Sequence, residues 1–175
     1  MPQRYETYGP FLLDGESADY LGRPSSIFWE KVESQYPGLS MAIGVYIVAA
    51  RNKNGSLPWY VGMTEKGFKS RLNQHRKTFP LITAKCEEGT QEIYLIARQK
   101  LKRDAFMKAG GTRRPGISHL ETRLIETCLK RNRDLHNDRN TRGLKDTVVP
   151  GYMNDKGKRS RSAASLNALI TGNAT

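Results

Sequence analysis

The sequence predicts an α+β fold in which a small, three-stranded, mainly antiparallel sheet is flanked by helices. Two apolar runs, at 42–50 and 57–63, are separated by the turn signal Asn54-Gly55, and together they predict a β-hairpin. A third β-type run at 91–98 supplies the remaining strand. Amphipathic stretches after the second and third strands predict the flanking helices.

The first run, 42–50, is apolar on both alternations, which is typical of a central strand covered on both faces. It carries Tyr46, and the second run carries Tyr60. A strict two-residue loop at Asn54-Gly55 would direct these two side chains to opposite faces of the sheet. A shared site therefore requires a bulge or an odd-length loop, and Pro58, which cannot donate to a ladder, favours an irregularity in the second strand.

The segment 64–76 predicts an amphipathic helix that Thr64 opens. Its apolar line is formed by Phe68, Leu72 and Phe79. Arg71 and His75 are i,i+4 neighbours on this helix, so their side chains lie on the same face and can contact the same group. The alternatives are a solvated surface charge for Arg71 and a satisfied core histidine for His75.

A further helix is predicted from His119 to about Arg131, and Glu121 lies near the middle of its apolar side. An inward carboxylate is costly unless a cation, a metal or hydrogen bonds compensate it. The alternative is a capping box, in which Glu121 turns back to the amide of Ser118, and a residue so near the helix start can do both. Glu126 falls on the polar side and is not a candidate.

The 175 residues suffice for one domain with short extensions. We expect an acidic N-terminal appendage over 1–40, the α+β module over 41–150 and a basic flexible tail over 151–175, in which 163–170 predicts a marginal helix. Within the appendage we expect an irregular lead-in, then a short helix capped by Ser25 or Ser26.

No run approaches the roughly 20 apolar residues of a membrane span, and the N-terminus lacks the apolar segment of a secretory signal. We therefore expect an intracellular, cytoplasmic protein with no membrane partner. Cys86 and Cys128 are widely separated and have no clustered histidines, so neither a zinc site nor a disulfide is indicated.

The net charge of +12 is unevenly distributed. Residues 1–40 carry three basic and six acidic side chains, so their net charge is −3 and the rest of the chain carries +15. Such a surplus is typical of proteins that bind a polyanion, usually nucleic acid. A generically basic, solvated surface is the alternative, because charge alone does not specify chemistry.

Six positions resemble, in order and approximate spacing, the functional positions of the GIY-YIG endonuclease family: Tyr46, Tyr60, Arg71, His75, Glu121 and a downstream asparagine. The resemblance covers roughly residues 42–137. Asn137 fits the terminal position better than Asn132, and both remain candidates. The chain departs from the family pattern where Val45 and Val61 replace isoleucines and where Met63 replaces a polar or cationic residue.

The resemblance implies a metal-dependent endonuclease that hydrolyses phosphodiester bonds in DNA by a one-metal mechanism, with Mg²⁺ or Mn²⁺ as cofactor. Arg71 would donate hydrogen bonds to two phosphate oxygens, and Glu121 would bind the cation. Tyr60 or His75 would act as the base, with Tyr46 orienting the base or the water. Basic side chains expected to contact the nucleic acid are Lys66, Lys69, Arg76, Arg113 and Arg114.

The chain's stand-alone size suggests a restriction, phage-encoded or defence nuclease, acting as a monomer or a homodimer. Three alternative functions remain open: a non-catalytic nucleic-acid-binding protein with the same fold, an RNA-directed nuclease, and an interaction protein whose basic face binds an acidic partner.

Overall fold

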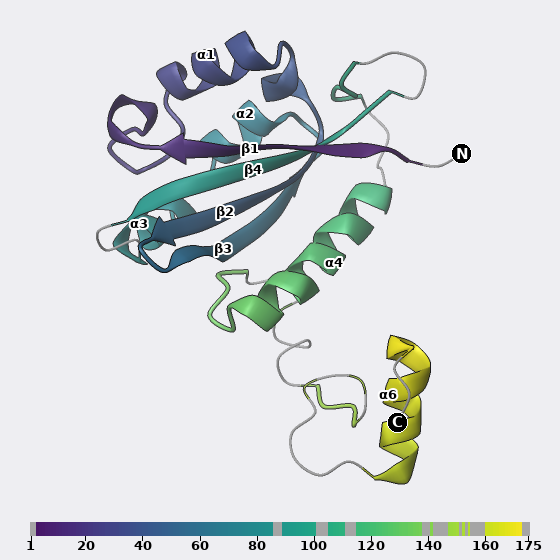
Figure 1. The fold of residues 1–175 in the computed structure, drawn as a ribbon. Helices are drawn as coiled ribbons and strands as arrows, with labels where there is room; N and C mark the ends of the chain where they lie inside the picture. Colours follow the sequence, from purple (N-terminus) through teal and green to yellow (C-terminus); the bar gives the residue numbers. More distant parts are fainter. Residues whose placement is uncertain are drawn as a thin grey trace. The chain divides into compact units, whose positions relative to one another are not determined.

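The computed structural model describes residues 3–85, 89–100, 105–110, 115–137, 141, 147–150, 152, 154 and 160–172. The chain forms two compact units, residues 1–137 and residues 138–175. The first unit contains the sheet and four of the helices seen in Figure 1.

The first unit is built on a four-stranded antiparallel sheet with the strand order β1-β4-β2-β3. The strands are β1 (Tyr5–Leu13), β2 (Gly44–Asn52), β3 (Gly55–Thr64) and β4 (Thr90–Arg98). β2 lies between β4 and β3, as the apolar run predicts for a central strand. The α+β class is confirmed, whereas the prediction of three strands is wrong by one.

The additional strand is β1, which pairs with β4 along the edge of the sheet (Figure 1). The expectation of an irregular lead-in is therefore wrong for these residues. The alternation of side chains in β1 is interrupted at Gly9-Pro10, where the register with β4 shifts. A proline is tolerated there because an edge strand does not need every amide for pairing.

Four helices cover the sheet: α1 (Ser26–Gln35), α2 (Phe68–Asn73), α3 (Thr78–Lys85) and α4 (Pro115–Arg131). The helix expected after Ser25 is confirmed as α1, and the Ser25 hydroxyl accepts a hydrogen bond from the amide of Phe28. Residues of β1 and α1 lie in the same core as β2 and β4. The expected N-terminal appendage therefore contributes a strand and a helix to the first unit.

The core lies between one face of the sheet and α1, α2 and α3. The sheet contributes Tyr46, Val48, Ile93 and Leu95, and the helices contribute Trp29, Phe68, Leu72, Phe79 and Ile82, all of them buried. The predicted apolar line of 68, 72 and 79 is confirmed. Helix α4 contacts β3 and β2 and lies alongside β3 in Figure 1.

In the second unit, α6 (Arg161–Thr171) begins after Ser160, whose hydroxyl accepts a hydrogen bond from the amide of Ala163. The marginal helix expected at 163–170 is confirmed. Across the residues that the structure describes, no helix combines the length and the apolar character that a membrane crossing requires.

Candidate active site

Tyr46 and Tyr60 lie on the same face of the sheet because of a bulge in β3. The pairing of β2 with β3 changes register next to Pro58, where Trp59 is the extra residue. Beyond the bulge Tyr60 lies opposite Val48, and alternate residues of β2 share a face. The two tyrosine rings are consequently 6.2 Å apart between centroids. The irregularity predicted in the second strand is confirmed.

Gly62 makes room for Tyr46, which lies opposite it in the hairpin. A Cβ atom at Gly62 would overlap the phenol oxygen of Tyr46 and would also come within 2.9 Å of the Tyr60 ring. Gly44 has a different role, because a Cβ there would overlap the carbonyl oxygen of Ile96 in β4. The two glycines therefore allow close approach, of a side chain at Gly62 and of a strand at Gly44.

Helix α2 begins later than predicted. Thr64 is the last residue of β3 rather than a helix cap, and its hydroxyl donates to the carbonyl of Gly67 over 3.1 Å. Gly67 has a φ of 100°, a conformation that glycine adopts without strain, and Phe68 is the first helical residue.

Helix α2 also ends earlier than predicted, at Asn73. His75 lies in the connection to α3, so the prediction that Arg71 and His75 share one continuous helix is wrong. The two residues nevertheless act on the same group. The positive charge of Arg71 acts on the Tyr46 hydroxyl, and the Nε2 atom of His75 makes a short hydrogen bond to the same hydroxyl.

His75 is held neutral at physiological pH. Its pKa is lowered from 6.5 to about 4, mainly by burial and further by the positive charge of Arg71. Its other ring nitrogen, Nδ1, lies 3.3 Å from the hydroxyl of Thr78 at the start of α3.

Both ring nitrogens of His75 contact a hydroxyl group: Nε2 contacts Tyr46, and Nδ1 contacts Thr78. A neutral imidazole donates from one nitrogen and accepts at the other, so one of these hydroxyls donates to the ring and the other accepts from it. The sequence pattern did not indicate Thr78, because its role depends on the break between α2 and α3.

Tyr46 remains protonated in this environment. Burial raises its pKa well above the ordinary value, and the charges of Tyr60 and Glu121 act in the same direction. The positive charge of Arg71 opposes the increase. These interactions place Arg71 and the carboxylate of Glu121 within electrostatic reach of one buried hydroxyl.

Glu121 belongs to the second turn of α4, because this helix begins at Pro115 rather than His119. The carbonyl of Ser118 accepts a hydrogen bond from the Thr122 hydroxyl over 3.1 Å, as expected inside a helix. Ser118 is therefore not the N-cap, and the capping-box alternative for Glu121 is wrong. Glu121 is half-buried.

Glu126 differs from Glu121 although both lie on α4. Its carboxylate accepts a hydrogen bond over 3.0 Å from the exposed side chain of Arg123, one helical turn away. It is therefore occupied in a local surface ion pair, which agrees with its exclusion as a candidate.

Asn137 holds the backbone of β3. Its side-chain oxygen accepts from the amide of Val61 over 3.0 Å, and its nitrogen donates to the carbonyl of the same residue. Asn132 donates to the carbonyl of Pro58 over 2.8 Å. Asn137 thus acts next to Tyr60, and Asn132 acts on the far side of the bulge.

The segment 132–137 therefore covers the edge of β3. A fourth hydrogen bond, from the amide of His136 to the carbonyl of the bulged Trp59, is 2.7 Å long. An edge strand presents unpaired backbone groups, and a bulge adds one more. These contacts satisfy such groups and hold the part of β3 that carries Tyr60.

Five of the six positions thus lie near one buried hydroxyl: His75 hydrogen-bonds Tyr46, the Tyr60 ring lies beside the Tyr46 ring, and the charges of Arg71 and Glu121 act on the hydroxyl. They come from β2, β3, α2, the connection after α2, and α4. Of the expected nucleic-acid contacts, Lys66, Lys69 and Arg76 are exposed at the two ends of α2. Arg113 and Arg114 lie outside the described residues, as does Cys86, whereas Cys128 is buried.

The oxygen atoms at this site fit a hard divalent cation. Mg²⁺ prefers oxygen ligands and is commonly held by one or two carboxylates together with waters and phosphate oxygens. Within the described part of the chain, no three or more His, Cys, Asp or Glu side chains gather into a group that could enclose an ion. A cation at Glu121 would therefore complete its shell with water and substrate.

Comparisons with protein-family models, curated proteins and solved structures found no match to this chain. The function of the chain is therefore inferred from the geometry and chemistry of the side chains around Tyr46.

Proposed function

We propose that this protein is a GIY-YIG-type endonuclease that hydrolyses phosphodiester bonds in DNA with one Mg²⁺ or Mn²⁺ ion. The observation that supports this proposal is the meeting of Tyr60, Arg71, His75 and Glu121 around the hydroxyl of Tyr46. Hydrolysis at phosphorus needs a cation near the phosphoryl oxygens, a proton acceptor for water and a ligand for a metal. This group of residues offers all three.

Arg71 binds the phosphate. A guanidinium carries five N–H donors in one plane, so Arg71, whose charge acts on the Tyr46 hydroxyl, can donate two hydrogen bonds to nonbridging phosphate oxygens. Its charge then stabilises the negative charge that develops as water attacks.

Tyr46 and His75 form the acid–base pair. The Tyr46 hydroxyl hydrogen-bonds Nε2 of neutral His75, so in the tautomer whose Nε2 is the acceptor, Tyr46 can pass its proton to His75 while it takes one from the attacking water. An entering phosphate opposes the charge of Arg71 and thereby raises the basicity of His75. Tyr60, whose ring centroid is 5.1 Å from that of His75, borders the space where the water would lie.

Glu121 is the metal ligand. The bound cation would neutralise the charge that develops on the leaving O3′ oxygen. Glu121 also raises the pKa of Tyr46, because its negative charge disfavours the phenolate. Asn137 keeps Tyr60 in place through the backbone of Val61.

The charge of the chain supports a nucleic-acid substrate, and DNA is the substrate that the resemblance to the GIY-YIG endonucleases implies. The net charge is +12, and three exposed basic residues lie on or next to the helix that carries Arg71: Lys69 on it, and Lys66 and Arg76 on either side of it. Phosphate contacts of this kind give affinity and orientation without reading sequence.

The test is cleavage of supercoiled plasmid DNA in Mg²⁺ and in EDTA, with single-stranded DNA and RNA assayed in parallel. Glu121→Gln should abolish the metal-dependent product and leave DNA binding intact. Glu126→Gln is the matched control on the same helix and should cleave like the wild type. Binding without any metal-dependent product would replace the proposal with a non-catalytic nucleic-acid-binding protein, and product from RNA alone would replace DNA as the substrate.

A further inference from the structure

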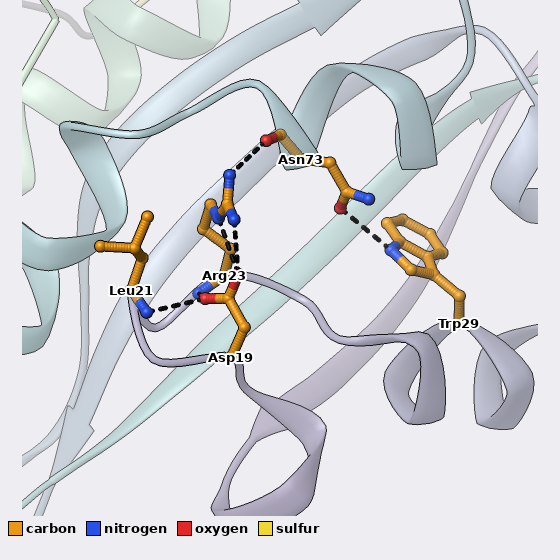
Figure 2. Close-up of polar contacts among 5 residues, drawn as sticks. All are labelled: Asp19, Leu21, Arg23, Trp29 and Asn73. Carbon is orange, nitrogen blue, oxygen red and sulfur yellow. Dashed lines mark hydrogen bonds and ion pairs between the residues drawn. The ribbon is translucent and has the colours of Figure 1, made fainter.

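Arg23, which lies outside the candidate site, binds the end of α2 (Figure 2). Both Nε and Nη2 of Arg23 contact one carboxylate oxygen of Asp19, at 2.8 and 2.7 Å. The remaining guanidinium nitrogen, Nη1, donates over 2.8 Å to the main-chain carbonyl of Asn73, fifty residues away in the sequence. Arg23 therefore links the N-terminal segment to the last residue of α2.

Further hydrogen bonds hold Asp19 and Arg23 in the positions that this contact requires. The other carboxylate oxygen of Asp19 accepts hydrogen bonds from the amides of Leu21 and Arg23, both 2.9 Å long. The side chains of Arg23 and Asp19 are only 18% and 24% exposed. Burial raises the pKa of Asp19, but the hydrogen bonds and the charge of Arg23 outweigh burial, so its pKa is lowered and it stays ionised. The guanidinium is thus fixed by a partner that water screens poorly.

Helix α2 needs an external contact of this kind. It has six residues, and isolated helices shorter than about 12 residues are marginal because nucleation is unfavourable. The last carbonyl groups of a helix lack intrahelical partners and attract positive charge. Arg23 supplies both a donor and a charge to Asn73, and the indole N–H of Trp29 lies 3.4 Å from the side-chain oxygen of Asn73.

The end of α2 also sets the positions of two candidate catalytic groups. Arg71 precedes Asn73 by two residues, and His75 follows it by two residues. A displacement of Asn73 would move both groups away from the Tyr46 hydroxyl that they share.

We propose that Arg23 is a positioning residue. By binding the Asp19 carboxylate and the Asn73 carbonyl at the same time, its guanidinium holds the end of α2 so that Arg71 and His75 both lie near Tyr46. The catalytic consequence rests on the proposed nuclease function, whereas the structural consequence for His75 does not.

The experiment compares Arg23→Lys and Arg23→Gln with the wild-type full-length chain. Lysine keeps the positive charge but cannot hold Asp19 and Asn73 at once. Arg4→Ala is the matched control, because Arg4 forms an exposed ion pair with Glu6 in the same N-terminal segment. The readouts are the pKa of the His75 imidazole by NMR, the kcat and KM for plasmid cleavage, and the Tm.

We expect both Arg23 variants to raise the pKa of His75 from about 4 toward 6.5, since a loosened α2 end exposes the ring and separates it from Arg71. We also expect kcat to fall by at least about tenfold while KM stays within about twofold, because misplaced groups lose rate rather than binding. Arg4→Ala should leave the pKa, kcat and KM unchanged.

An unchanged His75 pKa in both Arg23 variants, with only a lower Tm, would overturn the proposal. A rise of the His75 pKa in Arg23→Gln but not in Arg23→Lys would also overturn it, because that result would reflect the loss of positive charge and not the loss of the simultaneous contact with Asp19 and Asn73. Asp19→Asn provides a milder variant if both Arg23 variants fail to fold, and it should shift the His75 pKa in the same direction. If the wild type does not cleave DNA, the NMR readout still decides the role of Arg23.

Discussion

The protonation of His75 is the residue-scale property with the clearest consequence for pH dependence. Its pKa is about 4 in the folded chain and near 6.5 when unfolded, so the unfolded chain binds the proton more readily between these values. The contribution of this group to stability is therefore complete above pH 6.5 and is lost as the pH falls toward 4.

We predict that the His75 imidazole titrates with a midpoint near pH 4 in NMR spectra. The chain has three histidines, so His75→Gln assigns the signal. The Tm difference between the wild type and His75→Gln should also fall between pH 6.5 and pH 4, because only the wild type loses this contribution. A midpoint near 6.5 would show that the ring is solvated and not bound to Tyr46.

Gly62→Ala tests the fit of Tyr46 into the hairpin. The new Cβ would overlap the phenol of Tyr46, so we expect a loss of stability of about 1–3 kcal/mol and displacement of the hydroxyl from His75. Gly116→Ala is the control, since the three atoms nearest to its Cβ all belong to the flexible side chain of Gln3. Urea denaturation measures both variants, and equal stability of Gly62→Ala and the wild type would contradict the packing described.

At the scale of elements, the edge of β3 depends on Asn137. Replacement by Asp keeps an acceptor for the Val61 amide but removes the donor to the Val61 carbonyl. We predict a loss of about 1–3 kcal/mol, since a buried carbonyl is left without its partner, together with slower cleavage because Tyr60 is adjacent. Denaturation and plasmid cleavage measure these effects. If Asn137→Asp matched the wild type in both, the edge contact would have no functional role.

The hairpin and the main helix faces were predictable because side-chain periodicity determines them. Side chains alternate between the two faces of a sheet, so Tyr46 and Tyr60 could share a face only if the pairing between them was irregular. Pro58 indicated where this irregularity occurs. The apolar face of α4 was predictable in the same way, since Ile117, Ile125 and Cys128 are buried, even though the predicted start of that helix was wrong by four residues.

The remaining elements depend on contacts that periodicity does not encode. β1 pairs across about eighty residues with β4, and its alternation is interrupted at Gly9-Pro10. The end of α2 at Asn73 depends on Arg23, fifty residues earlier. Tertiary interactions of this range override local propensity, which favoured one continuous helix through Arg71 and His75.

At the scale of the whole molecule, the net charge of +12 predicts DNA binding that weakens steeply with salt. Replacing Lys69, which is exposed on α2, by Gln should weaken binding about equally for unrelated DNA sequences. The slope of log K against log salt should become shallower by about one. Fluorescence anisotropy at several salt concentrations measures this slope, and an unchanged slope would place the phosphate contacts elsewhere.

A double-mutant cycle on single-turnover plasmid cleavage in Mg²⁺ tests the central claim most directly, with the wild type, Arg71→Ala, Glu121→Gln and the double variant. If these residues act as one site, each single variant should lose a factor on the order of 10² to 10³. The double variant should be little worse than the slower single variant. Losses that multiply, or cleavage that neither substitution affects, would contradict a shared nuclease site around Tyr46.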